Sequence, residues 1–145
     1  MVESNSDRPM RAPWHLWLVG LLATLWNGFA AFDFTATAAR FEPYIKAMPP
    51  ELRDYIYSRS IWHFMIWGVA TWGGVIGALL LLLRQKLAVP ALDVSLAGAA
   101  ALFLIAIVRP EPHGMNDPTL AGIIALIALL LVAYTHWSSR RGALR

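Results

Sequence analysis

Three polar residues stand out in a sequence dominated by apolar side chains. Asn27 and Asp33 lie within or at the end of one apolar stretch, and His63 lies near the start of the next. An Asp beside a His favours the charged form of each, so Asp33 and His63 would suit a proton or cation site, and Asn27 a contact to a substrate or ion. The structural alternative is a hydrogen bond between helices for Asn27 and a tie between helix ends for the pair. We single out all three as candidate functional residues and favour the structural alternative.

Common catalytic and cofactor-binding patterns are missing from the sequence. The chain has no Cys, which excludes thiolate nucleophiles, disulfides and Cys-ligated metals. It also lacks the G-x-S-x-G, Walker A, Rossmann and H-E-x-x-H patterns. We therefore expect no catalytic, cofactor-binding or metal site, and no enzymatic activity.

Four long apolar stretches carry the candidate residues. Of the 145 residues, 58% are hydrophobic and 14% are charged, against about 25% charged in soluble proteins. Residues 61–83 contain no Asp, Glu, Lys or Arg, and as a helix they would measure roughly 34 Å, enough to cross a bilayer. We predict one domain over 1–145, an all-α polytopic integral membrane protein with a four-helix bundle. The predicted spans are 14–34, 61–83, 91–108 and 119–137.

The segments outside the spans contain fewer sequence patterns that predict structure. Residues 1–13 read as a disordered tail, and residues 35–60 as an outer loop. Proline at a first helical position followed by an acid predicts a short helix near 50–58. This helix would lie in the membrane interface or pack on the ends of the spans. Asp93 is expected in the first turn of the third span, where the helix dipole favours an acid.

Small residues predict how the helices touch. Lipid tails are as apolar as Leu, so membrane helices associate through close contact and hydrogen bonds. Gly73 and Gly77 form a GxxxG pattern in the second span, with Gly74 and Ala78 one step around the helix. The pattern serves packing inside the bundle or a homodimer, and we favour the internal role because every helix of a bundle needs close neighbours.

The basic residues predict an orientation. Seven of the twelve Lys and Arg residues lie at the two termini and in the 84–86 loop. Positive charge on short segments favours the cytoplasmic side, so both termini are expected there, in a bacterial inner membrane. Basic excess in such a protein indicates lipid headgroup contacts and not nucleic acid. A cleaved signal peptide is the alternative for the first stretch, and we disfavour it because such apolar regions have about 7–15 residues.

Several short motifs together resemble a known family. They are Trp14-His15-Leu16-Trp17-Leu18, Leu25-Trp26-Asn27 with Asp33, Pro50-Glu51-Leu52, Tyr55-x-Tyr57-Ser58, Trp72-Gly73-Gly74, and Ala88-Val89-Pro90-Ala91. They resemble a family of small bacterial four-span membrane proteins whose members are often labelled sugar transporters. The likeness covers residues 14 to about 100. It implies transport, and it singles out Asn27 and Asp33 without supplying an activity for them.

Two functions follow as expectations. The first is a small inner-membrane protein that is a structural, accessory or sensing component and not an enzyme. The alternative is an oligomeric transporter of sugar-like small solutes, since four spans in one subunit leave little room for a central path. A membrane enzyme or a quinone-linked partner is a third reading that no motif supports. The lipid bilayer is the expected partner, and a homo-oligomer stays open.

Overall fold

The computed structural model describes residues 13–109 and 117–145, and within these ranges the chain forms helices and no strand. All but the last residue of the tail predicted at 1–13, and residues 110–116 between the third and fourth predicted spans, lie outside the described residues. The helices, in chain order, are α1 (Trp14–Ala38), α2 (Glu42–Lys46), α3 (Pro50–Ser58), α4 (Ile61–Leu82), α5 (Ala88–Val108) and α6 (Pro118–Arg140). The four long helices confirm the predicted all-α fold, a four-helix bundle.

Each long helix is apolar over most of its length. All four are long and apolar enough to cross a membrane. Large apolar side chains point away from the bundle along all of them, such as Leu25, Val69, Leu104 and Leu130. A bilayer satisfies such side chains as well as a protein core does. The chain is therefore a membrane protein.

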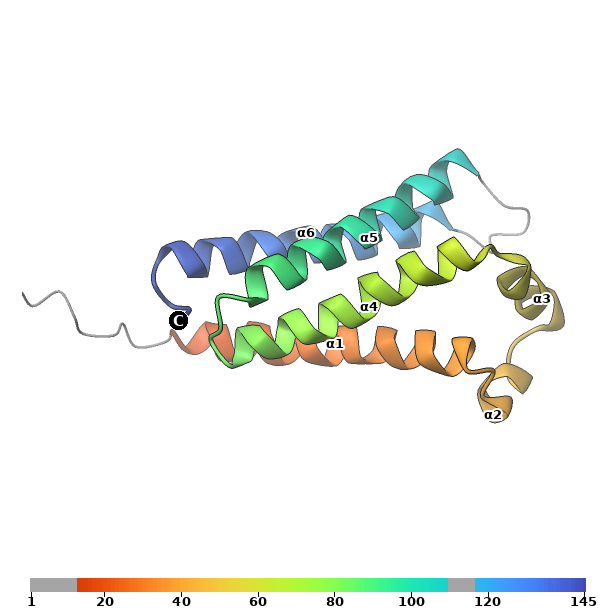
Figure 1. Ribbon diagram of the computed structural model, residues 1–145, viewed down its shortest axis with the longest axis horizontal. Coiled ribbons are helices and arrows are strands. Elements are labelled where there is room, and N and C mark those ends of the chain that lie inside the picture. The colour runs from red at the N-terminus through yellow and green to blue at the C-terminus, as the bar shows by residue number, and fades with distance from the viewer. Residues whose placement is uncertain (1–12, 110–116) are drawn as a thin grey trace, which may run out of the picture.

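The four long helices pack in chain order. Extensive interfaces join α1 to α4, α4 to α5 and α5 to α6, and within the described residues α1 and α6 share none of comparable size. Figure 1 shows α1 and α4 crossing in the lower half of the view and α5 with α6 in the upper half. The bundle is thus a curved layer with α1 and α6 at its two edges.

The glycine pattern of α4 lies against α5. A Cβ atom added at Gly73 would lie 3.4 Å from Ser95 Cβ, and one added at Gly77 would lie 2.5 Å from Leu92 Cγ. The second distance is too short for a real side chain, so α5 approaches α4 because Gly77 has none. Both glycines therefore face the inside of the bundle.

The helix boundaries differ from the predicted ones by a few residues. α5 begins at Ala88 and not at residue 91, because Pro90 falls in the first turn, where its missing N–H needs no partner. α1 runs four residues past the predicted end, to Ala38, and α6 runs to Arg140. The short helix predicted near 50–58 is α3, and α2 was not predicted.

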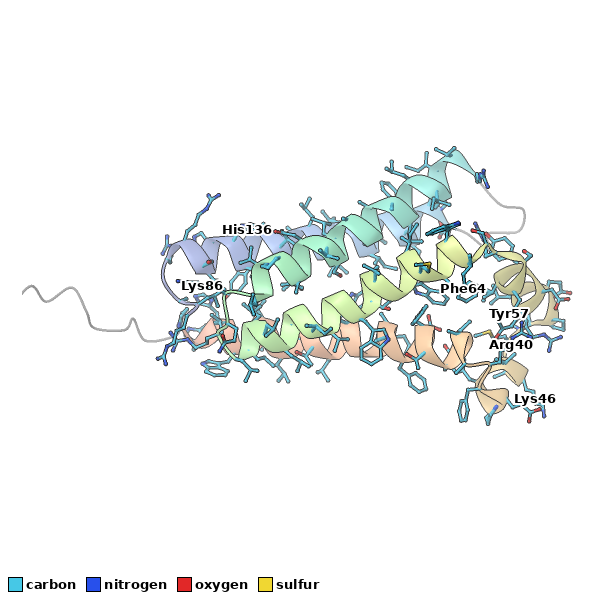
Figure 2. All side chains as sticks on the ribbon, viewed as in Figure 1. Arg40, Lys46, Tyr57, Phe64, Lys86 and His136 are labelled. Atoms are coloured by element: carbon cyan, nitrogen blue, oxygen red, sulfur yellow. The ribbon has the colours of Figure 1, made fainter. Side chains whose placement is uncertain are left out.

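Three helices end with a residue in the left-handed backbone region. Gly142 (φ 70°) follows α6, as glycine commonly does, but Arg40 (φ 52°) follows α1 and Arg84 (φ 59°) follows α4. The Arg40 guanidinium lies 4.4 Å from the centre of the Tyr57 ring on α3, and Figure 2 shows the two side chains together. The Arg84 Nε donates a hydrogen bond to the carbonyl oxygen of Ala143 at 2.9 Å. Each arginine thus links a helix end to a segment distant in the sequence.

Residues 143–145 fold back onto the α4–α5 connection. The Lys86 N–H donates to the Arg145 carbonyl at 2.9 Å, and the Arg145 N–H donates to the Arg84 carbonyl at 2.6 Å. Leu144, with 2% of its surface exposed, is buried with Ala143 among Leu16, Leu81 and Ala88. Figure 1 shows this segment beside the start of α1. The sequence predicted only a charged tail here, because three residues carry no periodic pattern.

Candidate functional site

A cavity lies between α1 and α6, the two edge helices. Its volume is about 800 Å³, within the range of pockets that hold one drug-sized molecule. Most of its lining is apolar and comes from α1, α4, α5 and α6, such as Leu22, Leu102 and Ile127. Polar side chains gather at the end next to α3, namely Asp33, Tyr55, Arg59, His63 and Asp117.

Asn27 lies midway along α1 and lines this cavity. Its Nδ2 donates to the carbonyl oxygen of Ala23 on its own helix at 2.8 Å, and a Cβ atom added at Gly74 would lie 2.0 Å from its Oδ1. The side chain therefore fills the space that Gly74 leaves on α4. The expected hydrogen bond between helices is not formed by the described residues, because the amide is used within α1.

Asp33 lies one turn before the end of α1 and lines the same cavity. The Tyr44 hydroxyl, on α2, donates to its Oδ1 at 2.5 Å. This hydrogen bond, burial and the nearby negative charge together raise the pKa of Tyr44 to about 12, since each disfavours the phenolate. The bond anchors α2 to the end of α1.

His63 is the third residue of α4 and also lines the cavity. Within the described part of the chain, neither a hydrogen bond nor an ion pair joins it to Asp33. The three residues singled out from the sequence thus share one cavity without forming an Asp–His pair.

Two residues of the α3 region complete the polar end of the cavity. The Arg59 guanidinium lies 4.5 Å from the centre of the Tyr55 ring. The Tyr55 hydroxyl is buried, and none of the described residues is its hydrogen-bond partner. The sequence analysis put Tyr55 in the predicted short helix near 50–58 and Arg59 in the outer loop, and gave neither residue a role at a site.

Hydroxyl groups midway along the cavity are already satisfied. Ser95 Oγ donates to the Ala70 carbonyl oxygen at 2.5 Å, which links α5 to α4, and Thr71 Oγ1 donates to the Trp67 carbonyl oxygen at 3.0 Å. These groups serve helix packing, since the backbone takes the hydrogen that a ligand would accept. The middle of the cavity therefore presents a mainly apolar surface.

The other end of the cavity is closed by a link between the edge helices. His15 Nδ1 on α1 and the Tyr134 hydroxyl on α6 form a hydrogen bond of 2.5 Å. The Trp137 ring lies 5.8 Å from the His15 ring, measured between ring centres. The sequence put His15 at the start of the first predicted span but indicated no partner for it.

A second pair lies near this end, on the outside of the α5–α6 contact. His136 Nε2 lies 3.0 Å from Asp93 Oδ1, and both side chains are about two-fifths exposed. Figure 2 shows His136 at the same end of the bundle as Lys86. The prediction that Asp93 occupies the first turn of its helix was wrong, because α5 begins five residues earlier and its first turn has no acid.

The arrangement offers apolar surface with hydrogen-bonding groups at one end. Among residues 13–109 and 117–145, no three His, Asp or Glu side chains are grouped closely enough to hold a metal ion. A cavity with this polarity suits a molecule with an apolar body and a polar end.

Comparison with protein-family models, curated protein sequences and solved structures finds no match to this chain.

Proposed function

We propose that this protein is a small, non-catalytic component of a bacterial inner membrane that binds an amphipathic molecule in the α1–α6 cavity. Such a protein would act as an accessory or sensing component. The observation that carries the proposal is the cavity itself, about 800 Å³ between two helices that share no extensive interface, with an apolar middle and a polar end. A molecule dissolved in the bilayer would reach it between the edge helices.

Filling the cavity tests this proposal. Ala128 on α6 lines the cavity, whereas Ala133 on the same helix is exposed and does not. We expect Ala128→Trp to abolish labelling of cavity residues by a photoactivatable long-chain alcohol in proteoliposomes, and Ala133→Trp to preserve it. Labelled positions are mapped by mass spectrometry of peptides. Equal labelling of cavity residues in both variants, or none in the wild type, would contradict the proposal.

We also propose that both ends of the chain face the cytoplasm. The excess of Lys and Arg on short segments at the end where α1 begins and α6 ends supports this orientation. The polar end of the cavity would then face the other side of the membrane.

Transport of a small solute by an oligomer is the second proposal. It is favoured by one observation, that Asn27, Asp33 and His63 all line the same cavity. The satisfied hydroxyls of Ser95 and Thr71 leave few groups for a sugar midway along the path, so we rank it second. Uptake of labelled sugars by proteoliposomes, compared between wild type and Asp33→Asn, tests it. A monomeric state in mild detergent would count against it.

A further inference from the structure

We infer that the cavity takes a single-chain amphiphile with an uncharged, hydroxyl-bearing headgroup. The headgroup lies beside Tyr55 and Asp33, and the chain lies along the apolar surface toward Tyr134. This inference rests on the proposed function, because it names the class of molecule that the cavity binds.

The first step is the division of the cavity into a polar and an apolar part. Its polar end is formed by the last turn of α3, the end of α1 and the start of α6. From Asp33 back to Val19, α1 lines the cavity over about 21 Å, and Asn27 in this part is bonded to its own helix. One apolar chain fits such a space, and a cavity of about 800 Å³ holds one molecule of modest size.

The second step is the hydrogen-bonding capacity at the polar end. The Tyr55 hydroxyl is buried and lacks a partner among the described residues, so it is able to donate. The Asp33 carboxylate accepts one hydrogen bond from Tyr44 and has lone pairs for more. A hydroxyl group is both a donor and an acceptor, so it is able to accept a hydrogen bond from the Tyr55 phenol and donate one to the Asp33 carboxylate.

The third step is the charge at this end. Arg59 lies over the Tyr55 ring, and Asp117 accepts a hydrogen bond from the Thr119 N–H at the start of α6. With Asp33, the cavity end thus carries charges of both signs. A charged head of either sign would lie near a like charge as well as an opposite one, so the cost of its desolvation is only partly compensated. An uncharged polar head avoids this cost.

Competition between amphiphiles of equal chain length tests the headgroup. The protein in phospholipid nanodiscs is labelled with a photoactivatable alkylglycerol, in the presence of unlabelled alkylglycerol, alkyl sulfate or alkyltrimethylammonium. We expect alkylglycerol to compete for the cavity residues at about tenfold lower concentration than either charged amphiphile. Tyr55→Phe, which removes only the hydroxyl, should weaken alkylglycerol competition about fivefold.

A matched control lies at the opposite end of the same cavity. Tyr134→Phe also removes one phenolic hydroxyl, but that hydroxyl bonds to His15, so the order of the competitors should not change. If the charged amphiphiles compete as well as alkylglycerol, the headgroup inference is wrong while cavity binding stands. If no amphiphile labels the cavity, the proposed function itself fails.

Discussion

Arginine occupies two helix ends where glycine would be the easier residue. Arg40 and Arg84 both have positive φ, which costs a side chain with a Cβ about 1 kcal/mol or more. Their side chains offset this cost through contacts to Tyr57 and Ala143. The contacts of the arginine side chains thus explain why arginine occupies positions whose backbone conformation favours glycine.

Substitution of Arg84 separates the backbone cost from the side-chain contact. Arg84→Gly and Arg84→Ala both lose the bond to Ala143, but only alanine keeps a Cβ at positive φ. We expect Arg84→Ala to be less stable than Arg84→Gly by about 1 kcal/mol. Thermal unfolding in one detergent measures the difference, and the same order is expected at Arg40. A more stable alanine variant at both positions would contradict this account.

The stabilisation that a second single residue, Tyr44, provides should depend on pH. Its pKa in the folded protein is about 12, above the ordinary value of 10.0. The protonated phenol is favoured by folding, so this stabilisation is complete below pH 10 and is lost as the pH rises through 12. The tyrosinate absorbance of the wild type minus that of Tyr44→Phe should therefore titrate near 12. A difference spectrum that titrates near 10 would show that the bond to Asp33 does not persist in solution.

At the scale of helices, the contact between α1 and α4 depends on an unusual pairing of an amide with a glycine. Asn27 fills the space over Gly74, and no Cβ would fit there without movement. By contrast, the space around Gly28 on α1 is open. The two glycines thus differ in what an added methyl group would meet.

Alanine substitutions measure this difference. We expect Gly74→Ala to lower the free energy of unfolding by about 1–3 kcal/mol, because the Cβ overlaps Asn27. Gly28→Ala is the control and should be neutral or stabilising by about 0.5–1 kcal/mol, since alanine favours the helix. Asn27→Ala combined with Gly74→Ala should recover most of the loss. Additive effects of the two changes would show that Asn27 and Gly74 do not interact.

The sequence predicted elements better than it predicted contacts. The spans were found because a charge-free stretch of about twenty residues has one common explanation, whereas α2 has only five residues and carries no periodic pattern. Asn27, Asp33 and His63 line one cavity, but Asp33 bonds to Tyr44 in the helix that was missed. His15 and Tyr134 lie 119 positions apart, and Asp93 and His136 lie 43 apart. No local pattern points to such pairs.

For the whole molecule, the packing order places the start of α1 and the end of α6 at one end of the bundle and α2 with α3 at the other. Figure 2 labels a lysine at each end, Lys86 and Lys46. Both side chains are exposed. Substitutions at these two exposed positions therefore report the orientation of the protein in the membrane without disturbing the packing inside the bundle.

Single cysteines at these positions test the proposed orientation, since the chain has none of its own. We expect a membrane-impermeant maleimide to label Lys46→Cys in intact spheroplasts and Lys86→Cys only after permeabilisation. The reason is the excess of basic residues at the end that contains Lys86. The reverse pattern would overturn the orientation and leave the fold unchanged.

The fold-back of residues 143–145 has a consequence for synthesis. Leu16 and Leu144 share one buried cluster, although Leu16 lies in the first of the four long helices and Leu144 follows the last of them. While α1, α4 and α5 insert, the end of the bundle near Leu16 lacks this cover. Only after α6 has crossed the membrane does Leu144 reach its place, so completion of this cluster is a late event in assembly.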